Sequence, residues 1–152
     1  MLITIASVLD KDALEQARSL MKVLRWADGA ETAGATAREV KRNLQADLSS
    51  RSGAELRDLL KGAIQSHPVV QAAAQPSRYS KLIVSKTEVG GGYGLHIDNA
   101  LMPHGGDKMR TDVSFTLFLS NPEEYEGGEL QIEHAGQSIQ AKPQAGDLVL
   151  YP

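Results

Sequence analysis

The sequence contains no cysteine, few aromatic residues and no long apolar run. Without cysteine, disulfide bonds and thiolate metal sites are both excluded, and the absence fits a cytoplasmic protein. No stretch approaches the roughly 18 apolar residues of a membrane span. The apolar start has no basic residues and meets Asp10 too early for a signal peptide. We therefore expect a soluble, cytoplasmic protein without a membrane partner.

A strong excess of positive charge is missing too. The chain has 16 Lys and Arg against 19 Asp and Glu, for a net charge of −3. A nucleic-acid partner would favour a basic face, so we expect none. The 152 residues, 41% of them hydrophobic, are typical of one soluble globular domain. The sequence is therefore interpreted as a single domain over residues 1–152.

The first half, residues 1–76, predicts mainly helical structure. Asp10 is a typical N-cap, and Leu14, Leu20, Met21 and Leu24 follow at helical spacing as a core stripe. His67-Pro68 should interrupt a second helix, because the residue before proline is pushed out of the α region. The expected elements are a strand at residues 2–5, a helix from 10 to about 26, a loop at 27–37 and a helix at 54–65.

The second half, residues 77–152, changes to short runs of β-formers separated by Gly, Asn and Pro. Ala135-Gly136-Gln137 is typical of a hairpin tip. Ser114 and Thr116 alternate with apolar residues, as in a strand with one face on a core. We expect strands at residues 79–86, 93–98, 112–120, 129–134, 138–142 and 147–151. Helices followed by many strands indicate an α+β fold with a barrel or jelly roll.

The most informative stretch is His96-Ile97-Asp98, which follows a glycine-rich run at Gly90-Gly91-Gly92. In a strand, residues i and i+2 point the same way, so His96 and Asp98 should share one face. Fe(II) accepts both imidazole and carboxylate, and two histidines with one carboxylate leave positions open for oxygen chemistry. A bare His-x-Asp also occurs by chance as two surface polar residues of a strand. Its place at the end of an apolar strand, after a glycine loop, strengthens the case for a metal site, although two surface polar residues remain the commoner arrangement. The glycine run lacks the Lys-Ser/Thr of a phosphate loop, and we interpret it as flexible backbone.

Four stretches, in order, resemble the bacterial PKHD-type hydroxylases, relatives of the prolyl 4-hydroxylase catalytic domain. They are residues 93–100, 109–120, 125–130 and 145–152, with a looser resemblance at Val40-Lys41-Arg42-Asn43. The resemblance implies N-terminal helices packed on a double-stranded β-helix (jelly roll). It implies Fe(II) held by His96 and Asp98, 2-oxoglutarate as co-substrate and L-ascorbate as a helper. The implied function is a dioxygenase that hydroxylates an unknown substrate, small molecule or peptide, with succinate and CO2 as co-products.

Several positions depart from the family pattern. The family places its second metal histidine, and an arginine for the distal 2-oxoglutarate carboxylate, after the stretch that here ends at Pro152. We therefore expect the last strands of the roll to be missing, and the exposed sheet edge this leaves would favour a homodimer. Thr87 stands where the family often has a tyrosine, nine residues before the metal histidine.

Other polar residues near the site have ordinary structural interpretations. His104, in the 102–107 loop, is the nearest alternative iron ligand, but a solvated loop histidine is favoured. His134 is expected at the surface of a hairpin tip, and His67 as a capping or surface residue. Arg110 and Asp112 are expected to form a structural ion pair. Tyr93, three residues before His96, should point away from the iron face by strand parity.

Two other functions compete with a hydroxylase. The chain could be a catalytically inactive jelly-roll remnant that acts as a binding or interaction module, because the second histidine lies outside the sequence. A cupin-like metal enzyme is disfavoured, since cupins use further histidines and a glutamate close to the first histidine.

Overall fold

The computed structural model describes residues 2–32 and 40–152 of the chain. The helix α1 spans Lys11–Met21, and the side chain of Asp10 accepts from the Ala13 N–H at 2.8 Å, which confirms the predicted N-cap. The helix ends earlier than expected, and Trp26 lies instead in strand β2, Trp26–Asp28. The predicted helix was too long because Leu24, which lies beyond its end, packs into the same core as the helical residues.

The second helix, α3, spans Arg51–Ser66, with Ser50 as its N-cap. His67 leaves the helical conformation at φ −73° and ψ 119°, which confirms the predicted break. A further helix, α4, follows directly at Pro68–Ala74. Sequence analysis missed it, although proline suits the first position of a helix, where its missing N–H costs nothing.

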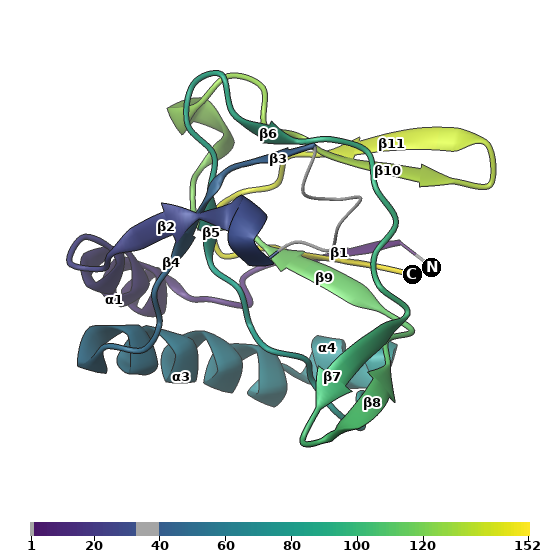
Figure 1. The fold of residues 1–152 in the computed structure, drawn as a ribbon, viewed down its shortest axis with the longest axis horizontal. Coiled ribbons are helices and arrows are strands. Elements are labelled where there is room, and N and C mark those ends of the chain that lie inside the picture. The colour runs from purple at the N-terminus through teal and green to yellow at the C-terminus, as the bar shows by residue number, and fades with distance from the viewer. Residues whose placement is uncertain (1, 33–39) are drawn as a thin grey trace.

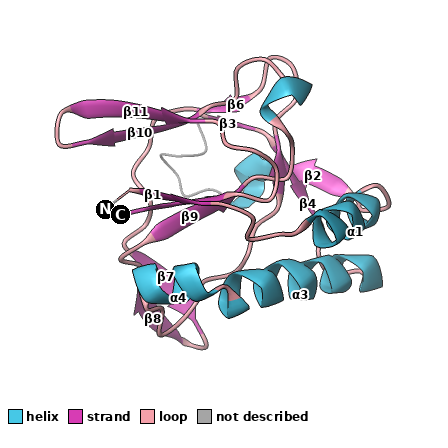
Figure 2. Ribbon diagram, turned by 180° about the vertical axis from the view of Figure 1, so that it is seen from behind, coloured by secondary structure: helices cyan, strands magenta, loops and turns pink. Residues whose placement is uncertain are grey.

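The strands form small antiparallel sheets, so the expected α+β class is confirmed. Figure 1 shows the β10–β11 hairpin projecting from the body, and Figure 2 shows α1, α3 and α4 along the opposite side. The sheet orders within the described ranges are β1-β12-β9, β2-β4-β5, β3-β6, β7-β8 and β10-β11. The remaining strand bounds are Ile3–Ile5 (β1), Lys41–Arg42 (β3), Leu44–Ala46 (β4), Ser85–Lys86 (β5), Gly92–Tyr93 (β6), Leu101–His104 (β7), Asp107–Arg110 (β8), Ser114–Leu117 (β9), Leu130–His134 (β10), Gln137–Ala141 (β11) and Leu148–Tyr151 (β12).

The predicted strands at 2–5, 129–134, 138–142 and 147–151 are confirmed within one residue at each end. The hairpin tip is confirmed too, since Ala135 and Gly136 both take positive φ, of 51° and 78°. All three α-helices of the described ranges lie in the first half, but that half also supplies β1 to β4.

Three predicted strands are much shorter than expected. Of residues 79–86 only Ser85–Lys86 are paired, of 93–98 only Tyr93, and of 112–120 only Ser114–Leu117. Leu82 and Val84 pack in the core, and the Val84 carbonyl accepts from the Ala46 N–H of β4 at 2.9 Å, but no strand is assigned at residues 79–84. The expected loop around His104 is the hairpin of β7 and β8. In the expected loop at 27–37, residues 26–28 form β2 and Gly29–Thr32 form the 3-10 turn η1; residues 33–37 lie outside the described ranges.

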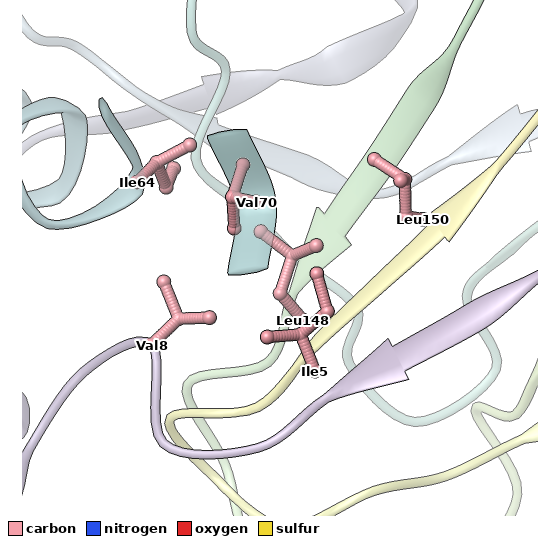
Figure 3. Close-up of a cluster of buried hydrophobic side chains, with 6 residues drawn as sticks. All are labelled: Ile5, Val8, Ile64, Val70, Leu148 and Leu150. Carbon is pink, nitrogen blue, oxygen red and sulfur yellow. The ribbon is translucent and has the colours of Figure 1, made fainter. Parts of the chain in front are cut away.

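Two buried clusters join the halves of the chain. The first combines β1, the turn after it, α3, α4 and β12, as Figure 3 shows. Its buried members are Ile5, Val8, Ile64, Val70, Leu148 and Leu150. The second places the predicted α1 stripe against α3, with Ala17 and Leu56 fully buried. Because β12 is the middle strand between β1 and β9, the first cluster also fixes the position of β9. No helix of residues 2–32 and 40–152 has the length and apolar character to cross a bilayer.

One ion pair ties α1 to the 3-10 turn η2, Pro122–Glu124. Both guanidinium NH2 groups of Arg18 donate to the Glu124 carboxylate, at 3.1 and 3.2 Å, and Arg18 Nε donates to the Leu119 carbonyl. The Asn121 N–H also donates to Glu124 Oε2 at 2.8 Å. This backbone bond, followed by the charge of Arg18, lowers the pKa of Glu124 below its ordinary value of 4.5.

We predict that Glu124→Gln reduces stability near neutral pH by a small amount that disappears in acid. A carboxylate with a lowered folded-state pKa stabilises the fold above its unfolded pKa, and this contribution is lost as the pH falls through the folded pKa. Urea unfolding of both proteins across that pH range measures the difference. Glu123→Gln is the matched control, because it removes a carboxylate from the same turn without touching Arg18. A stability difference between the parent and Glu124→Gln that stays constant through the acid range would contradict the lowered pKa of Glu124.

Candidate metal centre

The side chains of His96 and Asp98 meet, as the sequence predicts. His96 Nε2 lies 3.3 Å from Asp98 Oδ1. The two residues are not in a paired strand, since β6 ends at Tyr93 and residues 94–99 are irregular. The side chains still converge as expected for residues i and i+2, but Leu95 and Ile97, before and between them, are strongly exposed, at 75% and 94%, and do not pack in a core. An extended backbone alternates its side chains whether or not a neighbouring strand pairs with it.

A second contact fixes how the His96 ring presents its nitrogens. His96 Nδ1 lies 2.8 Å from the Gly94 carbonyl oxygen. A carbonyl can only accept, so this bond requires the proton on Nδ1. Neutral His96 then presents the lone pair of Nε2 toward the carboxylate of Asp98. Two electron-rich atoms at this distance are stabilised when they share a positive charge, either a proton or a metal cation.

The carboxylate of Asp98 is held from the opposite side. Ser114 Oγ, on β9, donates to Asp98 Oδ2 at 2.7 Å, which leaves Oδ1 to face His96. Metal ligands are commonly oriented by such hydrogen bonds from groups behind them. The role of Ser114 beside Asp98 is not evident from the sequence. The available signal was its place, with Thr116, on the polar face of a strand whose other face is apolar.

Backbone contacts hold both ends of the segment that carries the two residues. The Gly94 N–H donates to the Val40 carbonyl at 2.9 Å. A Cβ on Gly94 would lie 2.9 Å from Val40 Cβ, so the close approach requires glycine. At the other end the Thr111 N–H donates to the Ala100 carbonyl at 3.0 Å, and its hydroxyl donates to the Asn99 carbonyl at 2.5 Å.

Tyr93 lies against the site, contrary to the parity argument. Its ring stacks on the imidazole of His96, with centroids 3.7 Å apart and planes inclined by 15°. The prediction was wrong because it assumed a strand continuing from 93 to 98, whereas β6 ends at Tyr93 and the chain turns. Burial raises the pKa of Tyr93 above 10.0, and Asp98 and Tyr151 act in the same direction.

Tyr151, from β12, is a second phenol near the carboxylate. Burial raises the pKa of Tyr151 above 10.0, and the nearby Asp98 carboxylate raises it further. The hydrogen bond with Thr116, whose hydroxyl oxygen lies 3.3 Å away, acts in the opposite direction and lowers this pKa. Both phenols are therefore neutral at physiological pH. The surroundings of Asp98 thus combine hydroxyl donors with uncharged aromatic rings.

The other residues considered from the sequence lie apart from this pair. His104 is exposed on the β7–β8 hairpin and lines a hollow of about 660 Å3 formed by hairpin residues alone, without His96 or Asp98. His134 is exposed at the end of β10, as expected. Arg110 Nε and Asp112 Oδ1 form the expected ion pair at 2.7 Å, both strongly exposed.

Two further candidates have structural positions. Thr87 is exposed just after β5. His67 joins α3 to α4 without a side-chain cap bond. Of the expected ligands, the described residues bring together His96 and Asp98; they contain no group of three His, Cys, Asp or Glu arranged for a metal.

The pair fits a first-row divalent ion such as Fe(II). An imidazole nitrogen and a carboxylate oxygen converge, and the remaining polar atom of each side chain has its own partner, the Gly94 carbonyl and the Ser114 hydroxyl. An imidazole and a carboxylate are donor types that the two-histidine, one-carboxylate iron sites use.

Comparison with known proteins identifies the class. Residues 64–152 match the family model described as the 2OG-Fe(II) oxygenase superfamily. A PKHD-type hydroxylase of Hyphomonas neptunium is 50% identical over 151 residues, covering 99% of this chain and 67% of that protein. PKHD-type hydroxylases of Gluconacetobacter diazotrophicus and Aliarcobacter butzleri are 42% and 41% identical, each over the whole chain and 68% of their own length.

These matches support an enzyme of the dioxygenase and hydroxylase class. The chain belongs to the 2OG-Fe(II) oxygenase superfamily and is similar to its PKHD-type hydroxylases. It spans about two thirds of the length of these relatives. The family implies Fe(II) and 2-oxoglutarate as cofactor and co-substrate.

We predict that neutral His96 in the metal-free chain carries its proton on Nδ1. The Gly94 carbonyl stabilises that tautomer, and the carboxylate of Asp98 is the acceptor that the other tautomer would need. Long-range 15N–1H NMR correlations distinguish the two forms, with His134, exposed on its hairpin, as an internal reference. A predominance of Nε2–H at His96 would show that the Asp98 contact outweighs the Gly94 bond.

Proposed function

We propose that this chain is an Fe(II)- and 2-oxoglutarate-dependent dioxygenase that hydroxylates its substrate and forms succinate and CO2, with His96 and Asp98 as iron ligands. The observation that supports this best is the 3.3 Å approach of His96 Nε2 to Asp98 Oδ1, with a separate hydrogen bond behind each group. Iron and 2-oxoglutarate, when bound, supply the oxygen activation that C–H hydroxylation needs. Ascorbate, which keeps iron reduced, is part of the proposal.

The residues of the chain bind and orient in this scheme. His96 presents Nε2 because the Gly94 carbonyl holds the proton on Nδ1. Asp98 offsets part of the charge of a divalent ion, and Ser114 directs one carboxylate oxygen away from it. The ring of Tyr93 covers one face of the His96 imidazole, and the phenols of Tyr93 and Tyr151 are both neutral, so neither adds charge to the site.

We further propose that the paired strands belong to a double-stranded β-helix. It forms one domain over residues 1–152, and the helices of the first half support it. Pairing of β1 with β12 supports this, because it places strands from opposite ends of the sequence in one sheet. The shared buried cluster of β1, α3, α4 and β12 points the same way, since neither half completes that core alone.

The metal and co-substrate are tested together by anaerobic visible absorption. We predict a charge-transfer band when 2-oxoglutarate is added to the purified chain with Fe(II), because a keto acid chelating iron produces one. His96→Ala should abolish the band. His104→Ala is the matched control and should leave it intact, since His104 is exposed on the β7–β8 hairpin. A folded chain that gives no band would contradict the proposal, and would favour a jelly-roll binding module.

The hydroxyl of Ser114 provides a separate test of the ligand geometry. We predict that Ser114→Ala weakens Fe(II) binding by about 10- to 100-fold, the usual effect of removing a hydrogen bond behind a metal ligand. Ser114→Thr keeps the hydroxyl and should bind close to normally. Ser138→Ala removes a comparable hydroxyl from β11, where it bonds Gln131. Equal affinities for Ser114→Ala and Ser138→Ala would mean that Asp98 does not depend on Ser114.

A further inference from the structure

The segment that carries His96 and Asp98 is attached to a strand from the first half of the chain. β3 runs antiparallel to β6, with Lys41 opposite Tyr93 and Arg42 opposite Gly92. The bond from the Gly94 N–H to the Val40 carbonyl extends this pairing by one step. The described part of residues 1–76 therefore reaches the metal centre directly, and does more than support it from behind.

Lys41 occupies an unusual position on this strand. It is a buried lysine, with 7% of its surface exposed. Its ammonium nitrogen lies 5.1 Å from the centroid of the Tyr93 ring, within the range of a cation–π contact. Burial lowers the pKa of Lys41, while the carboxylate of Asp28 opposes this and favours the charged form. The amine of Lys41 is thus placed over an aromatic ring that itself touches a proposed metal ligand.

The contacts continue from Tyr93 to His96. The two rings are nearly parallel at 3.7 Å. The side chains on either side of His96 give the imidazole little other support, because Leu95 and Ile97 are 75% and 94% exposed. The Gly94 bond fixes one ring nitrogen, and the stack fixes the plane of the ring. The orientation of His96 Nε2 therefore depends on where the Tyr93 ring lies.

We propose that Lys41 is a positioning residue of the metal centre: by holding the ring of Tyr93, it sets the plane of the His96 imidazole and hence the direction of Nε2. The metal-binding part of this inference rests on the proposed function; the Lys41–Tyr93–His96 contacts do not. Lys41 does not touch the metal or the substrate. It acts through Tyr93.

The contacts can be measured in the metal-free chain by NMR. A ring stacked at this distance shifts the His96 ring protons upfield through its ring current, and Tyr93→Leu defines the unstacked position. We expect Lys41→Met to move the His96 signals most of the way to that position, and Lys41→Arg to restore them. Lys86→Met is the matched control, since it removes the cation–π contact of Lys86 with Trp26, at 5.0 Å, from another sheet. Lys41→Gln serves if Lys41→Met does not fold.

Affinity for Mn(II), read by electron paramagnetic resonance, then tests the consequence. We expect Lys41→Met and Tyr93→Leu to weaken binding by up to about tenfold, with Lys41→Arg near the parent value and Lys86→Met unchanged. Unchanged His96 signals in a folded Lys41→Met or Lys41→Gln variant would overturn the link. Shifted signals with unchanged affinity would overturn the positioning role. If the parent chain binds no metal through His96, both the proposed function and the positioning role of Lys41 are wrong. The NMR experiment in the metal-free chain still decides separately whether Lys41 holds the ring of Tyr93.

Discussion

Two electron-rich atoms, Nε2 of His96 and Oδ1 of Asp98, lie 3.3 Å apart, and several separate contacts keep them there. Such an arrangement is unfavourable without a shared positive charge, so the fold has to hold it. Ser114 restrains the carboxylate from β9, and the Gly94 carbonyl restrains the imidazole from within its own segment. β9 is in turn fixed through β12 to the buried cluster of the first half. The pair thus depends on the packing of the whole chain, although both residues are near the surface.

Much of this arrangement follows from local rules. Helix caps, helix breaks and tight turns each depend on only a few neighbouring residues. The Asp10 N-cap, the break before Pro68 and the β10–β11 turn were predictable from the sequence for this reason, whereas the Ser50 N-cap, equally local, was not predicted. The pairing of His96 with Asp98 was predictable for the same reason, because alternation requires only an extended backbone. It therefore survived the failure of the strand prediction for residues 93–98.

The predictions that were wrong, and the residues that were missed, depend instead on contacts beyond the local sequence pattern. Whether a run of β-formers becomes a strand depends on a partner elsewhere in the chain; of the strand predicted at 79–86, only Ser85–Lys86 pair with β4 in a ladder, and one further bond joins the Val84 carbonyl to Ala46. Tyr93 was misplaced because strand parity was carried past the end of β6. Ser114 and Lys41 were not recognised because the first is distant in sequence from Asp98, and the second belongs to the other half of the chain. The polar face of its strand marks Ser114 only as a candidate, and nothing in the sequence near Lys41 indicates its contact with Tyr93.

The part of the chain that defines the family and the part that builds the site are not the same. The family model begins at residue 64, whereas the similarity to the PKHD-type hydroxylases of Hyphomonas, Gluconacetobacter and Aliarcobacter extends over essentially the whole chain. β3 and Lys41 lie before residue 64, yet they contact Tyr93 and the backbone of Gly94. A general oxygenase core can supply the His-x-Asp pair, but in this chain the orientation of its histidine also depends on a strand outside that core. If His96 and Asp98 hold iron as proposed, the first half is a structural part of the metal centre, and a substitution there should alter metal binding without touching a ligand.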